Sequence, residues 1–143
     1  MKPSITPVAR ELGDRLANQI APQLTGFEAA TASMMSQMLE MISEEWDRAA
    51  SRLVEENTAI REILQQAAEV FNDDNLKTKA CEKDTDLRIS HLEQSNHQLR
   101  DLLTDIHARA EQTDSAEARL LEEVIWNELR ASVKRRQLSS ANF

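Results

Sequence analysis

The feature that most constrains this chain is a seven-residue apolar repeat between residues 35 and 70. Apolar side chains recur there at alternating steps of four and three residues, which places them on one face of an α-helix. A stripe of this length needs other helices to cover it, so the repeat predicts that residues 35–70 pack into a helical bundle. Only Glu56 interrupts the stripe, which consists of Met35, Leu39, Ile42, Trp46, Ala49, Leu53, Glu56, Ile60, Ile63, Ala67 and Val70.

The composition of the 143-residue chain points to the same fold class, because two glycines, no tyrosine and 3% aromatic residues leave little material for strands and tight hairpins. We therefore expect an all-α fold with one domain, residues 1–143, built as an elongated antiparallel bundle. One helix should be about 45 residues long, the seams should resemble those of coiled coils, and the chain should be oligomeric. The predicted helices span residues 7–21, 26–71, 84–112 and 115–137, with a linker at 72–83.

Local signals set these boundaries. Thr25 and Glu28 have the spacing of a capping box, which predicts the start of the long helix. The polar run 72–75 should end that helix, and Asp84 or Thr85 can cap the next one. A break of the long helix near residues 55–58 is an alternative, because Asn57 and Thr58 can cap a new helix.

Two stripes are candidate interfaces with another helix. One lies in the long helix, and the other lies in the predicted helix 84–112, where Asn96 falls among leucines at a core position. A buried Asn can specify the register of a homodimer seam, or it can meet a polar group within its own bundle. The methionines at 34, 35, 38 and 41 either line an adaptable groove for a partner helix or fill a core. The predicted interface residues are Met38, Ile42, Trp46, Leu53, Ile60, Leu92, Asn96, Leu99 and Leu103.

Charge and hydropathy argue against several classes of protein. A net charge of −8 repels phosphate backbones, so we do not expect general nucleic-acid binding. No segment has the length of apolar sequence that a membrane span requires. Cys81 is the only cysteine, which excludes an internal disulfide and favours the cytoplasm.

The sequence predicts neither an enzyme nor a cofactor. Bundles that bind two metal ions use Glu-x-x-His pairs, and His91, His97 and His107 all lack the glutamate. Cys81 has no base fixed near it by sequence. Two alternatives remain: a metal-binding bundle that uses Glu56 with His91, His97 or Glu111, and a small regulatory protein that touches nucleic acid through the basic run Lys134, Arg135 and Arg136.

The leading prediction is an interaction or scaffold protein. It would associate with a second copy of itself, most simply as a dimer, or hold a partner helix along its apolar seams. Many bacterial adaptors and export chaperones share this small, acidic, helical format, but a shared format does not define a function.

Overall fold

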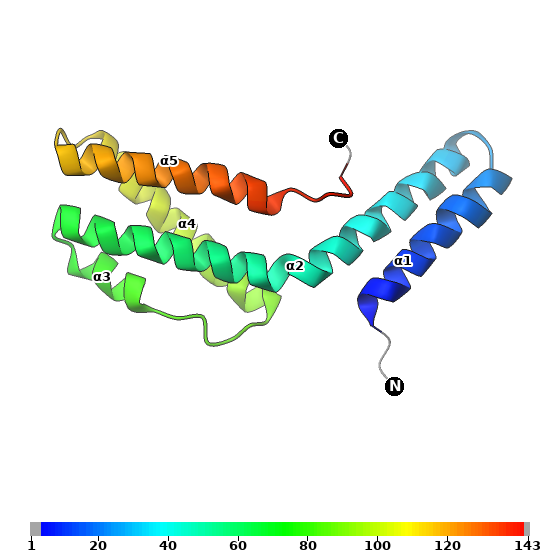
Figure 1. The fold of residues 1–143 in the computed structure, drawn as a ribbon, viewed down its shortest axis with the longest axis horizontal. Helices are drawn as coiled ribbons and strands as arrows, with labels where there is room; N and C mark the ends of the chain where they lie inside the picture. The colour runs from blue at the N-terminus through cyan, green and yellow to red at the C-terminus, as the bar shows by residue number, and fades with distance from the viewer. Residues whose placement is uncertain (1–3, 142–143) are drawn as a thin grey trace. The chain divides into compact units, whose positions relative to one another are not determined.

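The computed structural model describes residues 4–141, and it contains only helices, turns and loops within that range (Figure 1). The all-α prediction is therefore confirmed. The elements are α1 (Ile5–Arg15), which continues through a π-helical turn (Leu16–Ile20) and a 3-10 turn (Ala21–Gln23), α2 (Gly26–Phe71), α3 (Asp74–Cys81), α4 (Ile89–Glu111) and α5 (Ala116–Arg136).

The long helix α2 is 46 residues long and unbroken, so the alternative break near Asn57 does not occur. It begins at Gly26, whose φ of +60° lies in the left-handed region that a residue without a Cβ tolerates best. It ends before Asn72, which has a φ of +50°, a conformation that asparagine adopts more readily than most residues. The predicted bounds of this helix are confirmed.

The chain divides into two compact units, and the prediction of a single domain stays a prediction. We call residues 50–136 the bundle unit. We call residues 4–49 together with 137–141 the hairpin unit. The helix α2 contributes its C-terminal part to the bundle unit and its N-terminal part to the hairpin unit.

In the bundle unit, α4 and α5 pack along the C-terminal part of α2, and the short α3 lies beside it (Figure 1). The predicted apolar stripe of α2 is buried here from Leu53 to Ala67. Its side chains meet those of the other helices in one core, which contains Ile60, Ile63, Leu64, Ala67, Ala68, Leu76, Leu99, Leu103, Ile106, Ala110, Leu121 and Ile125.

In the hairpin unit, α1 runs antiparallel to the first part of α2. The Ser36 hydroxyl donates to the Gly13 carbonyl at 2.8 Å, and the Ser43 hydroxyl donates to the Thr6 carbonyl at 3.3 Å. The backbones approach closely at Gly13, where a Cβ would lie 3.4 Å from the Ser36 carbonyl oxygen, in ordinary van der Waals contact, so that only a side chain larger than alanine would separate the helices. The buried residues of this contact are small: Ala9, Gly13, Ala32, Ser36 and Ser43.

The first part of the predicted stripe is therefore not covered as we expected. Met35, Ile42 and Trp46 are each about half exposed. The reason is that α1 contacts the side of α2 that carries Ser36 and Ser43, one residue away from the stripe. The prediction of a buried stripe is correct for the bundle unit and wrong for these three residues within one chain.

Two element boundaries also need correction. The predicted linker 72–83 contains the helix α3, because the Asp73 carboxylate caps it by accepting from the amides of Asn75 and Leu76. The predicted helix 84–112 begins only at Ile89. Asp84 does not cap it, because its carboxylate accepts hydrogen bonds from Arg61 and Asn57 of α2.

Candidate interaction surface

The predicted interface residues fall into two groups. Five apolar residues of this set, Leu53, Ile60, Leu92, Leu99 and Leu103, are buried inside the bundle unit. Their apolar surface is covered by the chain itself. The other apolar members, Met38, Ile42 and Trp46, belong to the hairpin unit and are 54%, 49% and 53% exposed. Only these three are available to a second chain.

The remaining predicted residue, Asn96, is buried in a polar cluster of the bundle unit. Its side-chain amide donates to the Glu56 carboxylate at 3.3 Å and to the side-chain oxygen Oδ1 of Asn57 at 2.9 Å. Arg136, the last residue of α5, donates to both carboxylate oxygens of Glu56 at 2.7 and 2.9 Å, and to Asn96 at 3.3 Å. Asn96 therefore meets polar groups within its own bundle, which is one of the two roles that the sequence allowed, the other being a homodimer seam.

Glu56 is fully buried, and its charge is stabilised by arginines. Burial raises the pKa of its carboxyl group, but the hydrogen bonds and positive charge of Arg136, together with the charges of Arg52 and Arg100, outweigh burial and lower the pKa. Glu56 is therefore an ionised structural carboxylate, engaged by cations. Sequence analysis identified Glu56 as the interruption of the apolar stripe, but no sequence signal identified Arg136 as its partner.

The alternative metal and nucleic-acid sites lack support from this geometry. His91, His97 and Glu111 are exposed on α4. Across residues 4–141, no group of three His, Cys, Asp or Glu side chains could hold a metal ion. In the basic run, Arg135 forms an ion pair with Glu128 and Arg136 pairs with Glu56, so internal carboxylates already neutralise two of its three charges.

The hairpin unit has one apolar face and one polar face, and the sequence around each buried contact explains why. In four places a large apolar residue, a small buried residue and a polar residue follow one another. Successive residues are rotated by about 100° around a helix, so the apolar and polar residues flank the contact on opposite sides. The four triplets are Val8-Ala9-Arg10, Leu12-Gly13-Asp14, Met35-Ser36-Gln37 and Ile42-Ser43-Glu44.

The same rotational offset on two antiparallel helices directs both sets of side chains to the same face. The apolar residues of α1 and α2 therefore share one face, and their polar residues share the other. The polar side confirms this geometry, because Arg10 and Asp14 of α1 line one hollow of about 260 Å³ together with Glu40 and Glu44 of α2. Along the apolar side, the pairing of Gly13 with Ser36 brings Leu12 level with Met38 and Val8 level with Ile42, within one residue.

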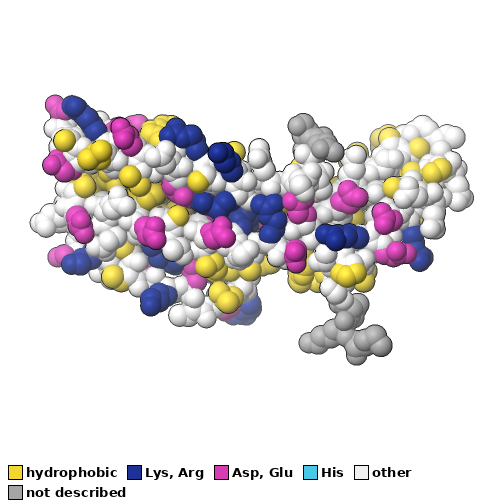
Figure 2. Space-filling view, viewed as in Figure 1, with side chains coloured by type: hydrophobic (Ala, Val, Ile, Leu, Met, Phe, Trp, Pro, Cys, Tyr) yellow, Lys and Arg dark blue, Asp and Glu magenta, His cyan; other side chains and the backbone are white. Residues whose placement is uncertain are grey.

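We call this surface the apolar face. Its large side chains are between 42% and 57% exposed. Figure 2 shows hydrophobic side chains at the edges of the hairpin unit, next to the acidic and basic side chains of the visible surface. The apolar face consists of Ile5, Val8, Leu12, Met35, Met38, Ile42 and Trp46, and Met34, one turn before Met38, extends it at the edge away from α1.

The polar face of the hairpin unit is occupied by the C-terminal segment of the chain. The Glu44 carboxylate accepts hydrogen bonds from the amides and hydroxyls of both Ser139 and Ser140, at 2.8–3.0 Å. These bonds, led by that from the Ser139 amide, lower the pKa of Glu44 to about 2. Arg48 donates to the Gln137 carbonyl oxygen at 2.7 Å. Within residues 4–141, the C-terminal segment thus contacts the polar face, whereas the large side chains of the apolar face are about half exposed.

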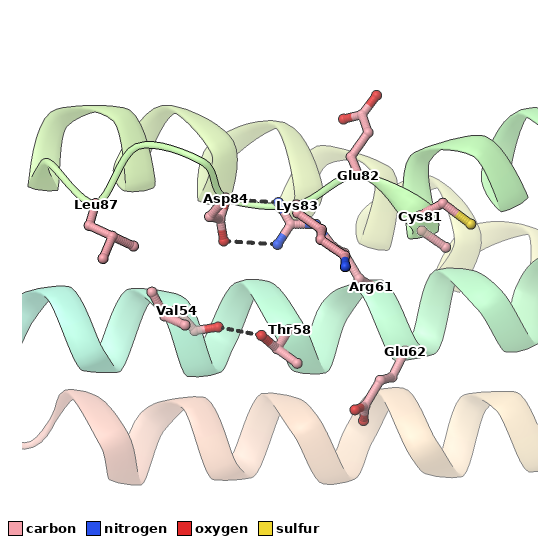
Figure 3. A pocket seen from close by; sticks show the side chains of 10 residues that line it. Val54, Thr58, Arg61, Glu62, Cys81, Glu82, Lys83, Asp84 and Leu87 are labelled. Carbon is pink, nitrogen blue, oxygen red and sulfur yellow. Dashed lines mark hydrogen bonds and ion pairs between the residues drawn. The ribbon is translucent and has the colours of Figure 1, made fainter.

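A cavity of about 670 Å³ lies in the bundle unit between α2 and the loop that precedes α4 (Figure 3). Arg61 and Asp84 point toward each other across it, joined by two hydrogen bonds of 2.8 and 2.9 Å, while Glu62 and Glu82 point away (Figure 3). Arg61 also donates to Ser95. The lining contains the thiol of Cys81 but no histidine that could act as its base. The cavity therefore holds a structural ion pair that fastens the loop to α2.

Within residues 4–141, no helix combines the length and apolarity needed to cross a membrane. Comparisons with models of protein families, with curated proteins and with solved structures find no match to this chain. The exposed face of the hairpin unit is thus the feature of the described chain from which a function can be argued.

Proposed function

We propose that this protein is a self-associating helical interaction protein that forms a homodimer through the apolar face of its hairpin unit. The observation that carries this proposal is the exposure of eight large apolar side chains on one face, beside a contact made of alanine, glycine and serine. A lone chain gains little by placing small residues inside and large ones outside. If a partner covers the outer face, the large side chains are buried there and contribute to the stability of the assembly.

The area of the apolar face supports a specific partner. At roughly 100 Å² for each half-exposed large side chain, the eight residues present on the order of 800 Å². Monomeric proteins rarely expose a contiguous apolar patch of more than about 300–600 Å². A standard protein interface buries about 800 Å² on each partner. One copy of the face therefore has about the area that a stable dimer requires.

The partner that we propose is a second copy of this chain. A hairpin of two antiparallel helices presents two parallel ridges, here with Val8 beside Ile42 and Leu12 beside Met38. Two such hairpins placed face to face form a four-helix bundle, in which each ridge finds an equivalent ridge. A twofold axis makes such an interface self-complementary, since every contact occurs twice. The polar faces and their C-terminal segments would remain on the outside.

The decisive experiment is sedimentation equilibrium of the purified chain over a range of concentrations, with the variant Ile42→Glu. The wild type should have twice the 16.2 kDa chain mass at micromolar concentration. The variant should be a monomer, because each copy would place an unpaired carboxylate inside the interface. Its circular dichroism should stay helical, since Ile42 is half exposed in the chain itself.

The matched control is Leu120→Glu, which also introduces a carboxylate at an exposed leucine but lies on α5 of the bundle unit. We expect this variant to dimerise as the wild type does. A wild-type chain that stays monomeric at high micromolar concentration would refute the proposal. Equal dissociation of both variants would also refute it, since the interface would then not be the apolar face. The cytoplasmic location stays a prediction that accompanies this function.

A further inference from the structure

Three methionines stand together on the apolar face. Met34, Met35 and Met38 are 57%, 53% and 54% exposed, so their thioether groups contribute a large share of the surface presented by α2. The fourth methionine of this stretch, Met41, is half buried. Leucine or isoleucine would supply similar apolar area with better-defined rotamers. What methionine adds is a sulfur atom that can be oxidised.

The oxidation of a thioether would act directly on this surface. A peroxide transfers one oxygen atom to the methionine sulfur: the O–O bond breaks, an S–O bond forms, and water or an alcohol leaves. The sulfur loses two electrons and the peroxide gains them. The product, a sulfoxide, is a strong hydrogen-bond acceptor, and such a group is costly to bury in an apolar interface without a donor.

We propose that Met34, Met35 and Met38 form a peroxide-sensitive modification site that dissociates the dimer. The inference rests on the proposed self-association, and it names how that same surface is regulated. Oxidation occurs on the dissociated chains, where the sulfur atoms are exposed, and an oxidised chain pairs poorly. The equilibrium therefore shifts from dimer to monomer as oxidation proceeds. Because methionine sulfoxide is a substrate of sulfoxide reductases, the change is reversible.

The test measures the dimer dissociation constant before oxidation, after oxidation and after repair. The chain carries Cys81→Ser throughout, because Cys81 is exposed in the bundle unit and would otherwise form disulfide-linked pairs. Hydrogen peroxide is the oxidant, and peptide mass spectrometry locates each added oxygen atom. We expect sulfoxide at the three methionines to raise the dissociation constant at least about tenfold, because a polar group is left without a partner. Treatment with both classes of methionine sulfoxide reductase should restore it.

A triple variant, Met34→Leu, Met35→Leu and Met38→Leu, separates this site from other oxidisable groups. Whatever its starting dissociation constant, peroxide should change that constant less than about twofold, since the leucines cannot be oxidised. The inference is overturned if all three sulfoxides form without a change in dissociation constant, or if the triple variant responds as strongly as its parent. An untreated protein that is monomeric at every concentration would instead refute the proposed function, and the inference with it.

Discussion

The arginine that neutralises Glu56 provides a quantitative test of the bundle unit. Replacing Arg136 with methionine keeps much of the side-chain volume and removes the cation that donates to both oxygens of a fully buried carboxylate. Breaking a buried ion pair by removing one partner usually costs about 3–5 kcal/mol. Here the cost should be smaller, since the Arg136 side chain is 43% exposed and Arg52 and Arg100 lie 3.9 Å from the carboxylate.

We therefore expect Arg136→Met to lower the free energy of unfolding of the bundle unit by about 2–3 kcal/mol at neutral pH. For a unit of this size the midpoint of thermal unfolding should fall by about 10–20 °C. The assay is denaturant unfolding followed by Trp126 fluorescence, with every protein carrying Trp46→Phe so that the signal reports the bundle unit alone. The matched control is Arg130→Met, an exposed arginine of the same helix that donates a hydrogen bond to the side chain of Asn127. Its effect should stay within about 0.5 kcal/mol.

The dependence of the unfolding free energy on pH distinguishes an effect of the Glu56 charge from an effect of packing. In the wild type the pKa of Glu56 is lowered in the folded state, so its stabilisation is present above the ordinary glutamate pKa and is lost as the pH falls through the lowered value. In Arg136→Met the carboxylate loses its main partner, and burial raises its pKa. Acid then neutralises the carboxylate and removes the penalty. The difference between the two proteins should shrink as the pH falls from 7 to about 4.

A double variant, Glu56→Leu with Arg136→Met, should recover most of the lost stability, because replacing both ions with apolar groups leaves no buried charge. Two results would refute the reasoning. One is a loss below about 0.5 kcal/mol for Arg136→Met, within the range of a surface change. The other is a loss that stays constant with pH, which would mean that the methionine disturbs packing and that the Glu56 charge is not the cause.

Two further predictions concern the hairpin unit. Gly13→Ala should be neutral or stabilising by up to about 1 kcal/mol, because its Cβ would lie in ordinary contact, 3.4 Å from the Ser36 carbonyl oxygen. Gly13→Leu should instead cost about 1–3 kcal/mol, because the larger side chain would force α1 away from α2. Equal melting temperatures for the two variants would contradict the close approach of these helices. Glu44→Ala should speed hydrogen exchange at the Ser139 and Ser140 amides, which donate to this carboxylate. In the wild type these amides should lose their protection from exchange only as the pH falls toward 2, since the pKa of Glu44 is lowered to about 2. If the amides remain protected in Glu44→Ala, other contacts hold the C-terminal segment.

Much of the fold follows from local signals in the sequence. The bounds of α2 were predicted from the spacing of Thr25 and Glu28 and from the polar run after Phe71, and in the structure the two ends coincide with the positive φ angles of Gly26 and Asn72. The helix α3 was missed because its burial depends on Leu76 alone, a single apolar residue in a polar stretch. The delayed start of α4 was missed for another reason: Asp84 has a capping residue's chemistry, but Arg61 and Asn57 bind it in the folded chain.

Helix propensity and apolar periodicity predict a helical chain whose longest helix has one apolar face, because both act within a few residues along the chain. Which part of that face is covered depends on how the other helices pack. The same repeat is buried at Ile60 and Ile63 and exposed at Ile42 and Trp46, since α4 and α5 supply large side chains to the core around the first pair, while α1 docks on neighbouring serines. The burial of a residue depends on the side chains that other segments pack against it, and the periodicity of one helix does not specify those side chains.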